Sequence, residues 1–302
     1  MHLQLPIPAL SCSEDKHVPL TLCRGDRTVT LADNSPTVII GERINPTGRK
    51  KMQAALLAND FSLVANEAKA QTEAGAHMLD VNVGVAGGDE PRLMLAAMQI
   101  VMDNSDLPLC IDTANATALE AALALYPGTA LINSVNGEDE KLERILPLVA
   151  RYKAAVVCLC MGNEGIPLTA EGRLEVARKI AGRAAAYGIP HEKLVFDCLC
   201  LPCGADQGSA RVTLDAIRLV KTEFGCSMTL GVSNVSFGLP ERVKLNISML
   251  TMAMANGVNC PIIDPTIPEV RQAILAADVL LGRDEWAMNW IAAARAAKAQ
   301  QQ

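Results

Sequence analysis

Residues 129–161 read TALINSVNGEDEKLERILPLVARYKAAVVCLCM, and this stretch decides the predicted fold. The runs 129–133 and 154–161 are short and almost continuously apolar, which is typical of strands buried in a parallel sheet. Between them, residues 138–152 place apolar side chains at spacings of three and four, which is typical of an amphipathic helix. The stretch therefore predicts a strand–helix–strand unit with two parallel strands.

The same alternation continues through the chain from residue 36 onward. Further helices are predicted at 61–74, 171–187 and 241–255, and a glycine follows each of them at the expected helix end. Eight strands, each followed by a helix, predict a (β/α)8 TIM barrel. A doubly wound open sheet is the alternative, although no G-x-G-x-x-G fingerprint supports it. The predicted strands are 37–41, 77–82, 108–112, 129–133, 154–161, 194–197, 228–231 and 258–264.

The first 35 residues lie outside this repeat, so we expect an N-terminal extension (1–35) followed by the barrel (36–302). Segments 20–23 and 28–31 alternate apolar and polar residues around Arg24-Gly25-Asp26, which predicts a small β-hairpin. Three placements remain open for the extension: it closes the bottom of the barrel, it forms a subunit contact, or it is a disordered arm.

The composition excludes several classes of function. With 27 basic and 33 acidic side chains the net charge is −6, which argues against nucleic acid as a partner, because phosphate binding needs a basic face. The longest clean apolar run, 154–161, is far shorter than the roughly 20 residues of a membrane-spanning helix, and no signal peptide is expected at the N-terminus. Most of the ten cysteines lie in strand-like runs, as reduced thiols do, so we expect a cytoplasmic protein.

Polar side chains collect at the ends of seven of the eight predicted strands. In a barrel these residues meet at the C-terminal mouth, where barrel enzymes bind their substrates. For any single residue, a role in a turn or a helix cap is an equally good explanation. As a ring, their donors and acceptors suit the amino-pyrimidinone edge of a pterin. The ring comprises Glu42, Asn45, Asp80, Asn82, Asp112, Asn115, Asn133, Asn136, Asp197, Asn234 and Asp264.

Histidine catalysis and metal chemistry are not expected. His77 and His191 fall at the starts of predicted strands, which is the end opposite the mouth. The run Cys198-x-Cys200-x-x-Cys203 offers three thiols, but no fourth ligand accompanies it.

Six segments of the chain resemble, in the same order, motifs of the methyltetrahydrofolate–corrinoid methyltransferase family. This family is a group of pterin-binding barrels, and the resemblance extends from about residue 37 to residue 282. It implies methyl transfer between a corrinoid protein and N5 of tetrahydrofolate, with tetrahydrofolate or 5-methyltetrahydrofolate as co-substrate. The segments are GERINPTGRKK (41–51), MLDVNVG (78–84), IDTAN (111–115), INSVNGE (132–138), FDCLCLP (196–202) and GVSNVSFGLPER (231–242).

The resemblance also implies roles for individual residues. Asp80, Asn115 and Asp197 would bind the pyrimidine edge of the pterin. Asn234 would be the catalytic residue, because it would hydrogen-bond N5 as the methyl group leaves or arrives. Further pterin-binding residues are Asn82, Asp112, Asn136 and Arg242.

The chain contains no D-x-H-x-x-G corrinoid-ligand motif, so a partner protein is expected to supply the corrinoid. The family also implies a homodimer. Its members transfer the methyl group in either direction. The SFGLPER segment favours transfer from methylcorrinoid to tetrahydrofolate, as in the demethylation of substrates such as glycine betaine, and the reverse direction is the alternative.

Two other activities are considered for a pterin barrel. A dihydropteroate synthase needs basic residues for its pyrophosphate leaving group after the seventh strand, where this chain has Ser233-Asn234-Val235. A non-catalytic pterin-binding module is the second alternative.

Overall fold

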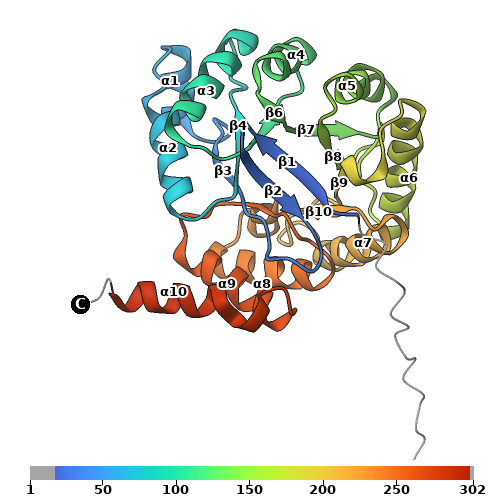
Figure 1. Cartoon of the computed structure of the whole chain (residues 1–302). Coiled ribbons are helices and arrows are strands. Elements are labelled where there is room, and N and C mark those ends of the chain that lie inside the picture. Colours follow the sequence, from blue (N-terminus) through green and yellow to red (C-terminus); the bar gives the residue numbers. More distant parts are fainter. Residues whose placement is uncertain (1–17, 300–302) are drawn as a thin grey trace, which may run out of the picture.

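A parallel eight-stranded sheet curves into a barrel in the computed structural model, which describes residues 18–299 (Figure 1). The strands are ordered β10-β9-β8-β7-β5-β4-β3-β11, and a parallel bridge between Gly231 and Ile262 joins the two ends. This arrangement confirms the predicted TIM barrel. The strands are β3 (Ile40–Ile44), β4 (Met78–Asn82), β5 (Leu109–Asp112), β7 (Leu131–Asn136), β8 (Ala155–Leu159), β9 (Leu194–Asp197), β10 (Ser227–Thr229) and β11 (Ile262–Ile263).

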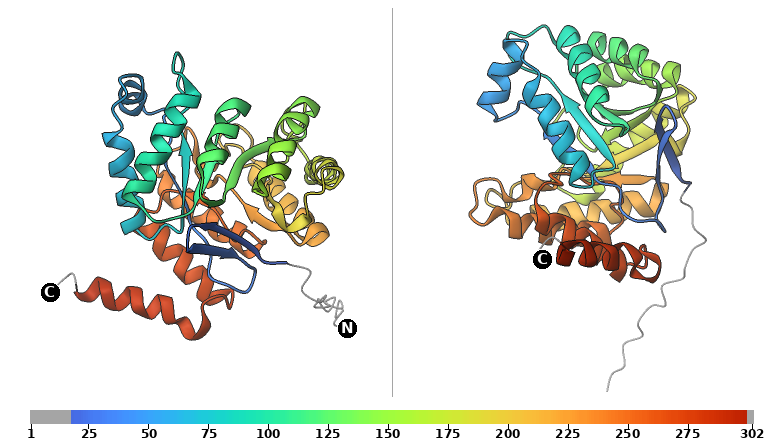
Figure 2. Two further views of the ribbon diagram at one scale, coloured as in Figure 1. Left: turned by 45° about the horizontal axis from the view of Figure 1, so that its top comes forward. Right: turned by 60° about the vertical axis from the view of Figure 1, so that its left-hand side comes forward.

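Helices surround the barrel and cover its outer face (Figures 1 and 2). The four predicted helices match α2, α5, α6 and α8 to within a residue at each end, whereas α1 and α10 were not predicted. The α-helices are α1 (Lys50–Leu57), α2 (Ser62–Glu73), α3 (Glu90–Asn104), α4 (Ala116–Leu125), α5 (Asp139–Tyr152), α6 (Ala170–Ala186), α7 (Ser209–Phe224), α8 (Arg242–Ala255), α9 (Pro268–Leu280) and α10 (Met288–Ala299). The short 3-10 helices are η1 (His191–Lys193), η2 (Val232–Ser236) and η3 (Glu285–Ala287).

The predicted hairpin is formed by β1 (Leu20–Arg24) and β2 (Arg27–Leu31), and it lies across the N-terminal end of the barrel (Figure 1). β1 also pairs with the short strand β6 (Gly128–Thr129). Because Gly128 lacks a Cβ atom, its backbone can lie directly against the Cys23 carbonyl. The hairpin therefore closes the bottom of the barrel, which is one of the three placements considered.

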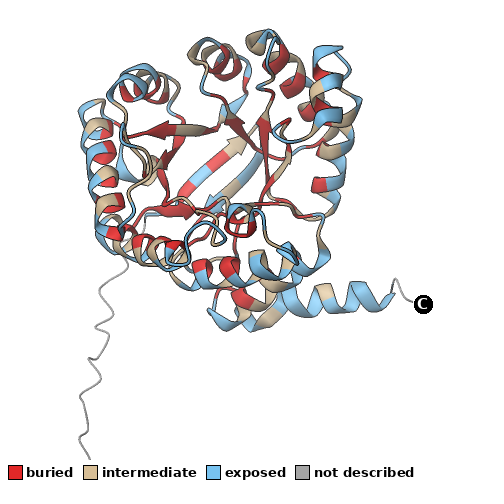
Figure 3. Ribbon diagram, turned by 180° about the vertical axis from the view of Figure 1, so that it is seen from behind, coloured by how far each residue is buried: buried red, intermediate tan, exposed pale blue. Residues whose placement is uncertain are grey.

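Apolar side chains of the hairpin fill the lower barrel. Leu20, Leu22 and Leu31 are buried and form one cluster with the lowest inward-facing barrel residues. A second, larger cluster lies between the sheet and the helices. Figure 3 shows the buried residues concentrated in the barrel strands and on the inner faces of the helices. Within residues 18–299, no helix is both long and apolar enough to cross a membrane.

The first barrel strand differs from its prediction, because β3 begins at Ile40 and ends at Ile44 rather than covering 37–41. Its register with β4 shifts between Gly41 and Ile44. A bulge of this kind adds a residue and redirects the side chains around it. The polar residues Glu42 and Arg43 are therefore part of the strand.

Candidate functional site

The inward-facing residues of the barrel change from apolar to polar toward the mouth. Ile40, Met78, Cys110, Leu131 and Val195 are buried in the cluster that packs on the hairpin. Side chains of a strand alternate between the two faces, so the residue two positions later points inward again, one layer nearer the mouth. These next residues are Glu42, Asp80, Asp112, Asn133 and Asp197.

Two hydrogen-bonded pairs connect the polar side chains of β4, β5 and β7. The Asn133 amide donates to the Asp80 carboxylate with an Nδ2–Oδ1 distance of 3.1 Å. The Asn82 amide donates to the Asp112 carboxylate over 2.9 Å. A pocket of about 140 Å³ lies beside Asp112, Asn133 and Asn136. The predicted residues Asp80, Asn82 and Asp112 thus lie together.

Burial changes the protonation of these carboxyl groups. Asp80 is only 2% exposed, and desolvation, with the nearby Asp112 charge, raises the pKa of Asp80 well above its usual value. Burial also raises the pKa of Asp112 to about 6, while the hydrogen bond from Asn82 opposes the rise. Because the charges of Asp80 and Asp112 repel each other, ionising both is unfavourable, so the pair retains one shared proton near neutral pH.

Asp197 ends β9 on the other side of the barrel. It is 5% exposed, and its Oδ1 accepts a hydrogen bond of 2.6 Å from the backbone amide of Leu199. Burial raises the pKa of Asp197 to about 6, and the amides of Leu199 and Gly231 and the charge of Arg173 act in the opposite direction. These donors orient the carboxylate at the mouth.

Glu42 was seen at a strand end in the sequence but was not among the predicted site residues. Burial, and next the charge of Asp264, raises the pKa of Glu42 to about 7. The charges of Arg43 and Arg242 and a hydrogen bond with Ser233 limit that rise. A carboxyl group with this pKa can exchange a proton at neutral pH. The sequence signal for Glu42 was its position two residues after the buried Ile40, because alternate side chains of a strand point to the same face.

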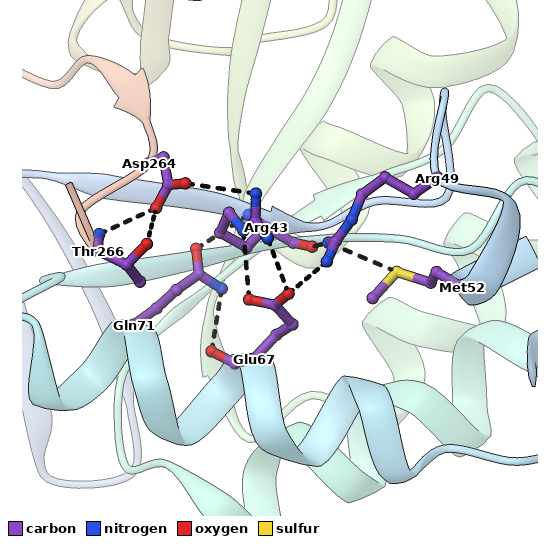
Figure 4. Close-up of polar contacts among 7 residues, drawn as sticks. All are labelled: Arg43, Arg49, Met52, Glu67, Gln71, Asp264 and Thr266. Atoms are coloured by element: carbon purple, nitrogen blue, oxygen red, sulfur yellow. Dashed lines mark hydrogen bonds and ion pairs between the residues drawn. The ribbon is translucent and has the colours of Figure 1, made fainter. Parts of the chain in front are cut away.

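A polar network outside the barrel fixes the bulge that carries Glu42 (Figure 4). The Arg43 guanidinium lies 3.2 Å from Glu67 and 3.4 Å from Asp264, and Arg49 also contacts Glu67. Gln71 accepts a hydrogen bond from the Arg43 backbone amide over 2.9 Å. A Cβ atom at position 41 would overlap the Gln71 side-chain oxygen, so only glycine allows this approach.

The predicted catalytic residue Asn234 is exposed on η2, which follows β10 at the mouth. The Asn234 side chain turns back toward Gly231 at the start of this turn. Its Nδ2 lies 3.7 Å from the point where a Cβ atom on residue 231 would be. Arg242, the first residue of α8, donates to the Ser233 carbonyl over 2.8 Å and to the Ser236 hydroxyl over 3.0 Å. In this structure Arg242 therefore stabilises the turn that presents Asn234.

Two predicted asparagines are engaged at helix starts. The Asn115 side-chain oxygen accepts from the amides of Thr117 and Ala118, which makes Asn115 the N-cap of α4. The Asn136 amide donates to Glu138 over 2.8 Å, immediately before α5. Asn133, which was seen only as a strand-end residue, lies in the polar layer instead.

The cysteines of the described segment are free thiols, including Cys198, Cys200 and Cys203. Among residues 18–299, no group of three or more His, Cys, Asp or Glu side chains is arranged to hold a metal ion. His77 accepts a hydrogen bond from the Ile39 backbone amide at the start of β4, and burial lowers the pKa of its imidazole.

Known proteins share this sequence pattern. The profile of the family described as pterin binding enzyme matches residues 41–264. The methylcorrinoid:tetrahydrofolate methyltransferase of Eubacterium limosum is 31% identical over 269 residues, which cover 86% of this chain and 97% of that protein. The methionine synthase of Mycobacterium tuberculosis is 32% identical over 275 residues, which cover 84% of this chain but only 23% of that protein.

Solved structures share the fold at lower identity. Dihydropteroate synthase from Yersinia pestis has a TM-score of 0.64 at 19% identity, covering 87% of this chain and 98% of that one. The enzyme from Thermus thermophilus in complex with 6HMPPP has a TM-score of 0.61 at 22% identity, covering 86% of this chain and all of that one.

Proposed function

The chain belongs to the family of pterin-binding enzymes, and we propose that it transfers a methyl group between a corrinoid protein and N5 of tetrahydrofolate. The family agrees with the resemblance carried by the six motifs. The observation that supports the proposal most strongly is the polar layer at the mouth, where Asp112, Asn133 and Asp197 lie two residues above an apolar floor.

In this proposal the polar layer binds the pyrimidine edge of the pterin. Ionised Asp112 and Asp197 accept from the ring N–H and amino groups, and a carboxylate can accept two such bonds at once. Asn133 supplies an amide that both donates and accepts. Asp80 lies in the same layer and orients Asn133 through their 3.1 Å hydrogen bond. Asp197 is buried and Asp112 and Asn133 are half-buried, so little water competes for these bonds, which strengthens them.

Asn234 acts at N5, as the resemblance implies. A tertiary amine is a poor leaving group, so the 5-methyl compound must gain a proton or a strong hydrogen bond at N5 by the transition state. An amide has no titrating proton to give, but it can orient and stabilise the protonated nitrogen. An interaction that strengthens only as the N–methyl bond forms or breaks accelerates the reaction.

Glu42 completes the proton balance. When N5–H of tetrahydrofolate accepts the methyl group, the product must release one proton, and the reverse reaction must return it. Glu42 has a pKa of about 7 and shares a hydrogen bond with Ser233, the neighbour of Asn234. Its carboxylate takes up the proton in one direction and its carboxyl group returns it in the other, directly or through water.

We further propose that the methyl group moves from methylcorrinoid to tetrahydrofolate. The Eubacterium limosum relative carries that direction in its name. Since both directions pass through the same transition state, the residues that lower the barrier are shared. The corrinoid protein and its methylated cofactor are substrates of this reaction.

The partner is proposed to dock over the barrel mouth. Two large apolar side chains are exposed there, Leu168 after β8 at 72% and Phe237 after η2 at 68%. Aromatic residues are enriched at protein interfaces, which makes Phe237 the stronger candidate contact of the two. We also propose that the protein is a homodimer and is located in the cytoplasm.

Binding and activity measurements distinguish the candidates. Calorimetric titration with tetrahydrofolate should show binding, whereas a mixture of p-aminobenzoate and 6-hydroxymethyl-7,8-dihydropterin pyrophosphate should give no 7,8-dihydropteroate. Formation of 7,8-dihydropteroate and pyrophosphate would instead support a synthase. Binding without methyl transfer to or from any corrinoid would support a non-catalytic module.

A further inference from the structure

Arg173 of α6 is a fully buried arginine that is bonded only to neutral oxygens. Its exposed fraction is 0%. Its Nε donates to the Pro167 carbonyl over 3.0 Å, and its Nη1 lies 2.8–2.9 Å from the Cys198 and Leu199 carbonyls and the Thr213 hydroxyl. Within residues 18–299 it forms no ion pair. Arginine is rarely buried unless it is paired, so this placement requires a reason.

The bonds of Arg173 fix the backbone that follows Asp197. The Cys198 and Leu199 carbonyls both converge on its Nη1 atom. Leu199 has a φ of +62°, a left-handed conformation that residues other than glycine rarely adopt. In this conformation the Leu199 amide donates to Asp197 Oδ1 over 2.6 Å. The hydrogen bonds from Arg173 to the Cys198 and Leu199 carbonyls thus offset the strain of the left-handed Leu199. That conformation in turn directs the Leu199 amide at the Asp197 carboxylate.

The same loop supports the turn that carries Asn234. Beyond Leu199, the backbone amide of Cys203 donates to the Val235 carbonyl over 3.0 Å. Gly204 also packs near the Leu239 side chain. A displacement of the loop after β9 would therefore reach η2 as well as Asp197.

We propose that Arg173 is a positioning residue: by binding the Cys198 and Leu199 carbonyls, it holds Asp197 in the orientation that binds the pterin. The inference rests on the proposed function, because it assigns Asp197 to the pterin. Arg173 itself lies below the loop and does not reach the mouth. Its positive charge favours the ionised form of Asp197, as does the Leu199 amide that it places. The thiols of Cys198, Cys200 and Cys260 also surround Asp197, and burial raises their pKa values, so they stay neutral.

Arg283 provides a matched control for a purely structural role. It is also buried, and its guanidinium donates to the Val258 and Met254 carbonyls over 3.1 Å. Met254 lies in the last turn of α8 and Val258 just after it, so these contacts are at the end of the barrel opposite the mouth. Loss of either arginine should reduce stability, but only loss of Arg173 should change Asp197.

The experiment compares Arg173→Met, Arg173→Lys and Arg283→Lys in the full chain. For each variant we would measure the denaturation midpoint, the Kd for tetrahydrofolate, and the pKa of the Asp197 carboxyl by carbon-13 NMR, with its signal assigned from Asp197→Asn. Arg173→Met should raise the pKa of Asp197 and weaken binding about tenfold, the loss typical of one hydrogen bond to a charged group. Arg173→Lys should restore part of the affinity, and Arg283→Lys should change stability alone. Arg173→Met combined with Asp197→Asn should bind no more weakly than Asp197→Asn.

Arg173 variants that lose stability but retain the wild-type pKa of Asp197 and the wild-type Kd would overturn the proposal, as would additive losses in the double variant. If Arg173→Met does not fold, Arg173→Lys decides by the same comparison. If the wild-type protein binds no tetrahydrofolate, the proposed function fails, while the pKa measurement still tests the role of Arg173.

Discussion

The Asn133 amide donates to the Asp80 carboxylate over 3.1 Å, although β5 separates the strands that carry the two residues. Their side chains meet because both point into the barrel, where the curvature of the sheet brings inward side chains of non-neighbouring strands together. The bond joins a predicted site residue to one that was not predicted to bind the pterin.

This relationship predicts different effects for two asparagine substitutions. Asn133→Ala removes a polar-layer side chain and the Asp80 partner, so the Kd for tetrahydrofolate should rise about tenfold. Asn115→Ala removes the N-cap of α4, so it should cost ~1 kcal/mol of stability with little change in Kd. Calorimetry and urea denaturation of both variants would measure this contrast. The reverse pattern would support the predicted pterin contact of Asn115.

Asn234→Ala should affect rate much more than affinity. The side chain stabilises N5 mainly in the transition state, so the single-turnover methyl-transfer rate should fall ~10²-fold or more while the Kd for tetrahydrofolate changes little. Asn256→Ala, in a half-buried asparagine at the C-cap of α8, far from the mouth, serves as the control and should leave both values unchanged. Equal losses of rate and affinity in Asn234→Ala would make Asn234 a binding residue only.

Glu42 predicts a pH dependence of stability. Its pKa is about 7 in the folded protein against an ordinary 4.5, so between these pH values the folded state keeps a proton that the unfolded state releases. The free energy of unfolding should therefore fall as pH rises through this window and stay low above it. Glu42→Gln should remove the loss, stabilising the protein by up to ~3 kcal/mol at pH 8 and little at pH 4. Urea denaturation at both pH values tests this, and an equal effect at both would contradict the assignment.

Phe237 predicts a contact with the corrinoid protein. Phe237→Ser should lower kcat/KM for the protein-bound corrinoid about tenfold, as loss of an exposed aromatic contact does, without changing turnover of free cobalamin. Leu280→Ser is the matched control, because Leu280 is 86% exposed at the C-terminal end of α9, away from the mouth. Equal effects of the two substitutions would place the partner elsewhere.

Strand ends were the most informative feature of the sequence. Asp80, Asp112 and Asp197 were found because each ends a short apolar run, and the barrel rule then places them at one mouth. Asn115 and Asn133 both follow such runs, and sequence spacing does not distinguish a helix cap from an inward side chain. Glu42 was seen just after the predicted end of the first strand and was given no role, whereas in the structure it is part of β3 and points into the barrel.

Other features depend on contacts between distant segments. Arg173 lies in a helical window where charged residues are usually solvated, and only the fold shows that it is buried beneath the loop after β9. The hairpin was predicted from its alternation, but its position at the bottom of the barrel follows from the packing of Leu20 and Leu22 against the barrel floor.

An anaerobic spectrophotometric assay tests the central claim most directly. The purified protein would be mixed with methylcob(III)alamin and tetrahydrofolate, and separately with cob(I)alamin and 5-methyltetrahydrofolate. We predict protein-dependent interconversion of the two cobalt spectra, slowed ~10²-fold or more in Asn234→Ala. A protein that binds tetrahydrofolate yet leaves both spectra unchanged, with free cobalamin and with corrinoid proteins alike, would contradict it.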